Sequence, residues 1–104
     1  MGPLVFIEQA MQFARYRGAV LAGDAANAST RGFIPRDVEP TVEVSERGLR
    51  FAAAIRDVDT GGPAGAIEYA MGGIAKNSVW YRALAAQARA VLREFRTVAE
   101  EMRR

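Results

Sequence analysis

The chain of 104 residues contains no cysteine and no histidine. These absences exclude disulfide bonds, thiolate chemistry, imidazole acid–base catalysis and the ordinary zinc sites. Serine hydroxyls remain, but no histidine is present to act as their base. We therefore expect that the protein is not an enzyme, with no catalytic residue and no cofactor. We also expect no metal ion, because the spacing of the central acidic residues matches no metal-binding loop; these residues are Asp37, Glu39, Glu43 and Glu46.

Long apolar runs and a large net charge are also lacking. No stretch approaches the roughly 18 apolar residues of a membrane-spanning helix. The apolar start from Leu4 to Ile7 has no basic region before it, so we expect no cleaved signal peptide. The net charge is only +2 and no aromatic platform accompanies the arginines, so nucleic-acid binding is not expected. Hydrophobic residues make up 50% of the chain, which indicates one folded domain, 1–104.

Apolar residues recur at alternating spacings of three and four in the N-terminal segment, 1–30. The stripe begins at Leu4 and Ile7 and continues through Leu21 to Ala28. This period predicts an amphipathic helix of the kind that packs in coiled coils. Pro3 suits the first turn of such a helix, because its missing N–H would have no partner there.

Proline and glycine punctuate the central segment, 31–64. Polar and apolar residues alternate from Thr41 to Ser45 and again from Leu49 to Arg56, around a short turn that contains Gly48. Two alternating runs around such a turn predict a β-hairpin. A short helix at the three alanines 52–54 is the alternative. Because an isolated hairpin is marginally stable in water, we expect it to lean on the helices or on a partner.

Two apolar seams, each repeating every seven residues, run through the C-terminal segment, 65–104. They consist of Ile67, Ile74, Tyr81, Ala88, Phe95 and Met102, and of Met71, Ser78, Ala85, Leu92 and Ala99. The repeat predicts a long helix with a left-handed packing partner. We expect Asp59 or Thr60 to cap it and Gly72–Gly73 to weaken its first turns. The predicted fold is mainly α, an antiparallel pair of long terminal helices with a short central hairpin or loop.

The two predicted helices differ in length, roughly 39 Å against up to 55 Å at 1.5 Å per residue. Part of the second helix therefore lacks a partner within one chain, while its apolar seam continues to Met102. An exposed apolar stripe of this length is a binding surface or an aggregation hazard. We expect contacts between subunits here, with arginines at the rim and Trp80 either in the rim of the core or an interface anchor. The expected interface residues are Trp80, Arg89, Leu92, Arg93, Phe95, Arg96, Val98 and Met102.

One segment carries more information than its periodicity. Nine residues between positions 21 and 37 keep a fixed spacing: Leu21, Ala22, Ala26, Asn27, Ala28, Thr30, Gly32, Phe33 and Asp37. This pattern resembles the N-terminal signature of bacterial flagellar basal-body rod proteins. Asp24 stands where that family usually has asparagine. Residues 71–96 look like the closing helix of the same family, and the run Ala75–Leu84 is closest to its proximal, FlgB-type members.

The signature also has a physical interpretation. Asn27 and Thr30 can hydrogen-bond the free backbone groups where the first helix stops, and Gly32 can take a positive φ that turns the chain. Phe33 can then fold back onto the helix. A helix-terminating turn is a sufficient explanation of these residues, and the resemblance adds that the turn packs between subunits.

The resemblance implies a structural axial protein that self-assembles through its terminal helices. It further implies export through the flagellar type III channel without a cleaved signal, a location in the periplasmic rod of the basal body, and partners that are copies of itself and other rod proteins. Direct membrane insertion is not part of this expectation. The alternatives are a small helical-hairpin interaction or adaptor module, and a rod-like paralogue without a role in motility.

Overall fold

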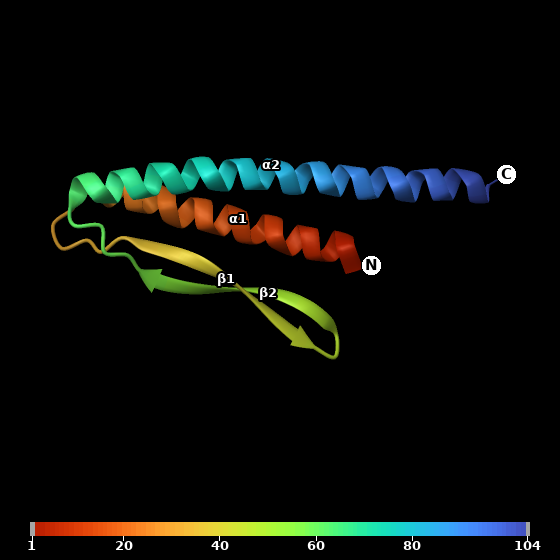
Figure 1. Ribbon diagram of the computed structural model, residues 1–104, viewed down its shortest axis with the longest axis horizontal. Coiled ribbons are helices and arrows are strands. Elements are labelled where there is room, and N and C mark those ends of the chain that lie inside the picture. Colours follow the sequence, from red (N-terminus) through yellow and green to blue (C-terminus); the bar gives the residue numbers. More distant parts are fainter. Residues whose placement is uncertain (1, 104) are drawn as a thin grey trace.

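The computed structural model describes residues 2–103, apart from the side chain of Leu49. Two helices flank an antiparallel hairpin (Figure 1), in the order α1 (Gly2–Asn27), β1 (Arg36–Ser45), β2 (Gly48–Asp57) and α2 (Pro63–Met102). The molecule is elongated, with extents of 65 × 29 × 14 Å. The predicted fold class is therefore confirmed. The short helix at residues 52–54 is wrong, because these alanines pair with β1 in the ladder.

The two helices pack antiparallel along a line of small residues. Three contacts set their register: Leu21 with Gly73, Ala14 with Asn77, and Ile7 with Leu84. A Cβ atom on Gly73 would lie 2.9 Å from Leu21 Cδ1, so glycine is what allows α2 to approach this closely. Leu21 is consequently fully buried. Gly72–Gly73 thus lies inside a continuous helix that begins at Pro63, and the effect of the two glycines on its stability stays a prediction.

As far as Leu84, the face of α2 that meets α1 is displaced by one residue from the predicted seam, whereas Ala88 of that seam does pack against the core. The buried positions are Ala66, Ala70, Asn77 and Leu84, with Gly73, Trp80, Ala88 and Val91 half-buried beside them. Ile67 and Met71 of the predicted seam point to solvent with 43% and 56% of their surface exposed. The physical reason is distance: alanine and glycine allow close helix contact, whereas the larger side chains of the other seam would hold the helices apart.

Asn77 is the one polar side chain buried on the α1-facing side of α2 in the described chain. Its Nδ2 donates a 2.7 Å hydrogen bond to the carbonyl oxygen of Ala14, and its Oδ1 has no hydrogen-bond partner in the structure. A Cβ on Gly18 would come within 3.4 Å of the same nitrogen. A single polar residue at a helix interface can fix register at a cost in stability, and Asn77 is placed to do this here.

The hairpin leans on α1, as expected. Phe51 of β2 packs against the rings of Phe6 and Phe13, with centroid distances of 4.7 and 6.2 Å. Its backbone N–H donates to Oε1 of Gln9 at 3.0 Å, so α1 also satisfies one strand amide. Towards the tip the hairpin leaves the helices, as Figure 1 shows, and Val44 there is 81% exposed.

The start of α2 is set by backbone geometry and not by a capping side chain. Gly62 is the N-cap with φ 134°, and Pro63 follows it in the first turn. The predicted caps are wrong: Asp59 accepts a hydrogen bond from the Gly61 amide, and the Thr60 hydroxyl donates to the Gly62 carbonyl. The chain turns so tightly here that both side chains bond the loop itself.

Substitution of Gly32 tests whether the turn after α1 requires a glycine. Its φ is +78°, so Gly32→Ala should lower the free energy of unfolding by about 1 kcal/mol, because alanine is strained in this region. Gly23→Ala is the matched control. Gly23 is helical and nothing lies within 4 Å of a Cβ placed on it, so alanine should stabilise by up to about 1 kcal/mol. Denaturant unfolding measures both, and equal effects of the same sign would contradict the assignment.

Candidate assembly interface

The signature residues build the turn that ends α1. Asn27 Nδ2 donates to the carbonyl oxygen of Gly23 at 2.9 Å, which satisfies one of the free carbonyls at the end of α1. The Thr30 amide donates to the Asn27 carbonyl at 2.9 Å, and the Phe33 amide to the Thr30 carbonyl at 3.1 Å. Ala28 is buried and Phe33 half-buried. The predicted helix-terminating turn is confirmed, with Gly32 at positive φ.

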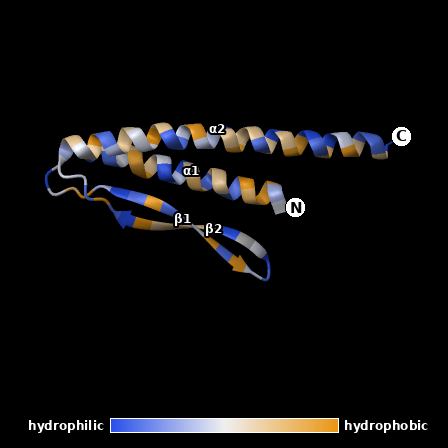
Figure 2. Cartoon of the chain, in the orientation of Figure 1, coloured by the Kyte–Doolittle hydropathy of each residue, from blue (hydrophilic) through white to orange (hydrophobic). Residues whose placement is uncertain are grey.

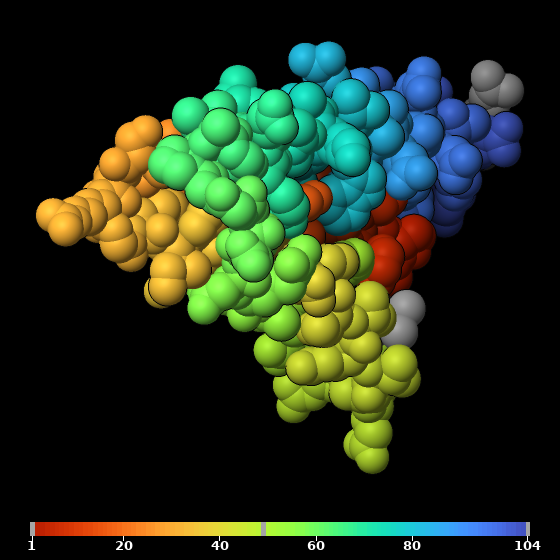
Figure 3. All heavy atoms as spheres, turned by 60° about the vertical axis from the view of Figure 1, so that its left-hand side comes forward, coloured from red at the N-terminus to blue at the C-terminus, as the bar shows by residue number. Residues whose placement is uncertain are grey.

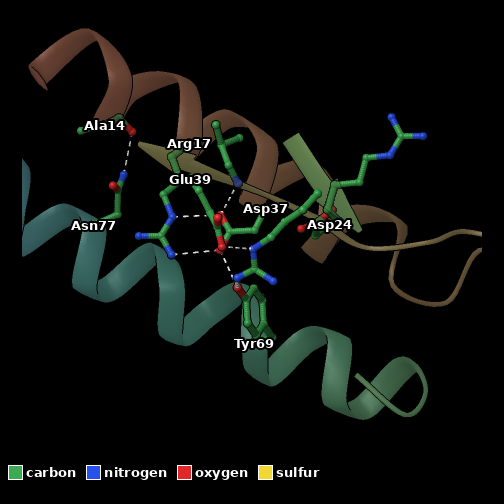
Figure 4. Close-up of polar contacts among 10 residues, drawn as sticks. Ala14, Arg17, Asp24, Asp37, Glu39, Tyr69 and Asn77 are labelled. Atoms are coloured by element: carbon green, nitrogen blue, oxygen red, sulfur yellow. Dashed lines mark hydrogen bonds and ion pairs between the residues drawn. The ribbon is translucent and has the colours of Figure 1, made fainter. Parts of the chain in front are cut away.

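Asp37, the last residue of the signature, lies at a buried junction of three elements (Figure 4). Arg17 of α1 donates to both of its carboxylate oxygens, at 2.9 and 3.0 Å. Tyr69 of α2 donates its hydroxyl to Oδ2 at 2.5 Å, and the Val38 amide donates to Oδ1 at 2.6 Å. One carboxylate therefore ties α1, β1 and α2 together. No sequence pattern points to Arg17 or Tyr69 as its partners, since neither belongs to the signature.

Electrostatics at this junction favour a structural role. Burial opposes ionisation of Asp37, but the hydrogen bonds from Arg17, Tyr69 and the Val38 amide together hold its pKa below the usual value. The Asp37 hydrogen bond raises the pKa of Arg17, and burial, then the bond to Asp37, raises the pKa of Tyr69. All three groups keep their ordinary charge states at neutral pH. Both carboxylate oxygens are already occupied, so the junction holds no free acid or base.

Asp24, in the last turn of α1, is a second buried carboxylate. Its Oδ1 accepts a 3.0 Å hydrogen bond from the Arg36 amide, whereas Oδ2 is buried without a hydrogen-bond partner in the structure. Burial raises the pKa of Asp24, and the nearby charge of Asp37 raises it further. An asparagine at position 24 would keep the hydrogen bond from the Arg36 amide and would carry no charge. Asparagine is also the residue type that the rod signature has at this position.

Two of the acidic residues of the central segment form ion pairs across the hairpin. Glu39 pairs with Arg56 at 2.6 Å and Glu43 with Arg50 at 3.9 Å, both exposed. Within residues 2–103, no three acidic side chains come together as metal ligands would. The described part of the chain also has no helix with an apolar run that would cross a bilayer.

The main uncovered surface is the end of α2. The helix contacts advance to Ile7 with Leu84, so Gly2 at the start of α1 lies level with about Arg89, and Val91 is the last half-buried residue of α2. From there α2 continues alone to Met102, as Figure 1 shows. We call residues 92–102 the overhang. Its apolar side chains are exposed by 45 to 80%: Leu92, Phe95, Val98 and Met102.

Phe95, Val98 and Met102 are the direct continuation of the α1-facing side of α2. They follow Leu84, Ala88 and Val91 at the helical spacing of three and four, and apolar residues recur along the overhang in Figure 2. The same face is thus covered by α1 up to Val91 and uncovered beyond it. Leu92 and Phe95 belong to the predicted apolar seams of α2, but α1 ends before it reaches them, and they are 49% and 45% exposed.

The other predicted interface residues divide into two groups. Trp80 packs edge-on against Phe13 with a ring distance of 6.0 Å and belongs to the rim of the intrachain core. Arg89, Arg93 and Arg96 are exposed, and none of them forms an ion pair within the described residues. They lie beside the overhang stripe, free to meet charges on another molecule.

Comparison with known proteins finds no matching family model and no matching curated protein.

Removing Arg17 tests whether the Asp37 junction holds the elements together. Arg17→Met should lower the free energy of unfolding by about 3 kcal/mol, because Asp37 is left buried without its counter-charge. Arg15→Met is the control two residues away. Arg15 is exposed and only donates to the Tyr81 hydroxyl at 3.4 Å, so its loss should change stability by less than about 1 kcal/mol. Similar losses for both variants would show that the junction has no special weight.

The raised pKa of Asp24 predicts how the stability of the protein depends on pH. Because its pKa is raised in the folded state, ionisation costs the folded protein more than the unfolded chain. Its contribution is most favourable below the ordinary aspartate pKa of about 4 and declines as the pH rises through the raised value. Asp24→Asn should therefore be more stable than the parent at pH 7, with the difference shrinking towards acid. Thermal melting across pH measures this, and a variant less stable at pH 7 would contradict it.

Proposed function

We propose that the protein is a structural subunit of an axial assembly of the flagellar rod type, which associates through the overhang of α2. The observation that carries the proposal is the seam between α1 and α2, which continues onto exposed apolar side chains where α1 has ended. A monomer gains nothing from such a surface, whereas an assembling subunit buries it against its neighbour.

The rod signature supports the same proposal. Its residues form one connected unit, in which Asn27 ends the helix, Gly32 turns the chain and Asp37 fixes the hairpin to both helices. This unit would hold the two terminal helices in the paired arrangement that the resemblance implies for rod proteins. By the same resemblance, the partners would be further copies and other rod proteins, the location the periplasmic rod, and the route type III export without a cleaved signal.

The chemistry of the buried groups favours assembly over catalysis. Asp37 and Tyr69 are bound to each other and to Arg17, and Asp24 is closed off from solvent. Groups with shifted pKa values mark active sites when they face a cleft, but Asp37 and Tyr69 face the joint between α1, β1 and α2. An adaptor without a role in motility would use the same overhang for a different partner. A rod subunit should associate with itself and with other rod proteins, whereas an adaptor should not.

Sedimentation velocity over a wide concentration range tests the proposal. The parent should associate with itself, and association should strengthen when the adjacent rod proteins are added. Phe95→Ala should weaken association by about 2 kcal/mol, roughly 30-fold, because a truncated aromatic anchor loses its buried contact.

Arg93→Ala is the matched rim control and should weaken association less than Phe95→Ala. The melting temperature of the Phe95→Ala monomer should stay close to that of the parent, since α1 does not cover this residue. A parent that remains monomeric at every concentration and with the rod proteins present would contradict the proposal.

A further inference from the structure

Each end of the molecule exposes apolar side chains, on a projecting helix at one end and around a pocket at the other. At one end is the overhang. At the other, the turn after α1 and the loop before α2 line an open pocket of about 590 Å³, with apolar residues that include Phe33, Ile34, Val58 and Pro63. Figure 3 turns this end towards the viewer, with the turn after α1, coloured orange, projecting from it. Ile34 is 55% exposed, so the apolar lining reaches the surface.

The lengths of the helices place these surfaces on the same long axis. α2 has 40 residues and α1 has 26. α1 ends at the pocket and α2 begins there, so the extra residues of α2 extend beyond α1 at the opposite end of the molecule as the overhang (Figure 1). A molecule with a projecting apolar tip at one end and an apolar hollow at the other can join to a second copy end to end.

A symmetric contact between two overhangs is less favourable than the contact of an overhang with a pocket. At 100° per residue, Arg89 and Arg96 lie along one flank of the stripe, and Glu94 and Glu101 along the other. In an antiparallel two-fold pair the same flanks meet, so arginine would face arginine and glutamate would face glutamate. A parallel pair would have fewer than two heptads beyond Val91, against the three or four that a sustained coiled coil shows.

The pocket and the overhang each carry exposed charges of both signs. Arg31 and Asp59 stand exposed at the pocket and form no ion pair within the described residues. Glu94 and Arg96 are likewise without an ion pair there. An end-to-end contact brings charges of both signs to each side of the joint, where they can pair.

We propose, building on the proposed function, that the overhang of one copy seats its last turns, with Val98 and Met102, in the turn-end pocket of the next copy. Such a contact joins two different surfaces and does not close on itself. It therefore extends along one direction into an axial stack, unlike a two-fold contact, which stops at a dimer.

The test uses one variant at each end of the full chain. Met102→Asp blocks the overhang, and Ile34→Asp blocks the pocket; both side chains are largely exposed, so both variants should keep the parent's helical content and melting temperature. Val44→Asp, at the exposed hairpin tip, is the matched control for adding an aspartate to an exposed apolar position. Sedimentation velocity follows each protein alone and the two blocked variants mixed in equal amounts.

We expect each blocked variant to lose self-association at least tenfold, while Val44→Asp associates like the parent. The mixture should form a one-to-one pair and nothing larger, because each variant keeps the one end that the other lacks. If Ile34→Asp associates like the parent while Met102→Asp does not, the overhang has another partner surface; the end-to-end contact is then overturned and the proposed function stands. A parent that never associates overturns both.

Discussion

The carboxylate of Asp37 is the point on which the arrangement of the elements depends. It is 2% exposed and receives hydrogen bonds from α1, from its own strand and from α2. Burying a charge is unfavourable unless it is paired and hydrogen-bonded, so the three elements must come together with their donors in place. The junction thereby fixes the hairpin against the pocket end of both helices, where Asp37 and Val38 are the buried residues of β1.

Helix packing then decides which surface is left over. α2 carries two apolar stripes one residue apart, and α1 takes the one with alanine and glycine because it allows the closer approach. The stripe with Ile67 and Met71 stays outside. Because α2 is longer, the inner stripe also reaches solvent beyond Val91. The surface available for assembly is thus a by-product of two constraints, the close packing of small residues and the unequal lengths of the helices.

Polar residues inside the helix pair add specificity more than stability. Asn77 donates one hydrogen bond to the Ala14 carbonyl of α1, and its Oδ1 has no hydrogen-bond partner in the structure. Asp24 likewise leaves one oxygen buried without a partner. Both groups lie on the line of contact between elements, where a shift in register would leave them with no partner at all. This explains how a helix pair rich in alanine, with few interlocking large side chains, keeps one alignment.

Much of the architecture was predictable from local pattern, because local pattern reflects local energetics. The periodicity of α1 and α2, the alternation of the hairpin strands and the turn built by Asn27, Thr30 and Gly32 all concern residues close in sequence. The excess length of α2 followed from counting residues. These features determined the fold class and the existence of an uncovered apolar end.

Tertiary structure alone decided the rotation of α2 and the partners of Asp37. Hydrophobicity favoured the larger side chains of α2 as its buried seam, but the choice depends on which stripe lets α1 come close, and Gly73 against Leu21 settles that. Arg17, Asp37 and Tyr69 are separated by 20 and 32 residues, so no local pattern links them. The sequence determined the elements by their own periodicity, and the packing of small residues and the pairing of a buried charge determined how they meet, because both energies exist only after distant segments are in contact.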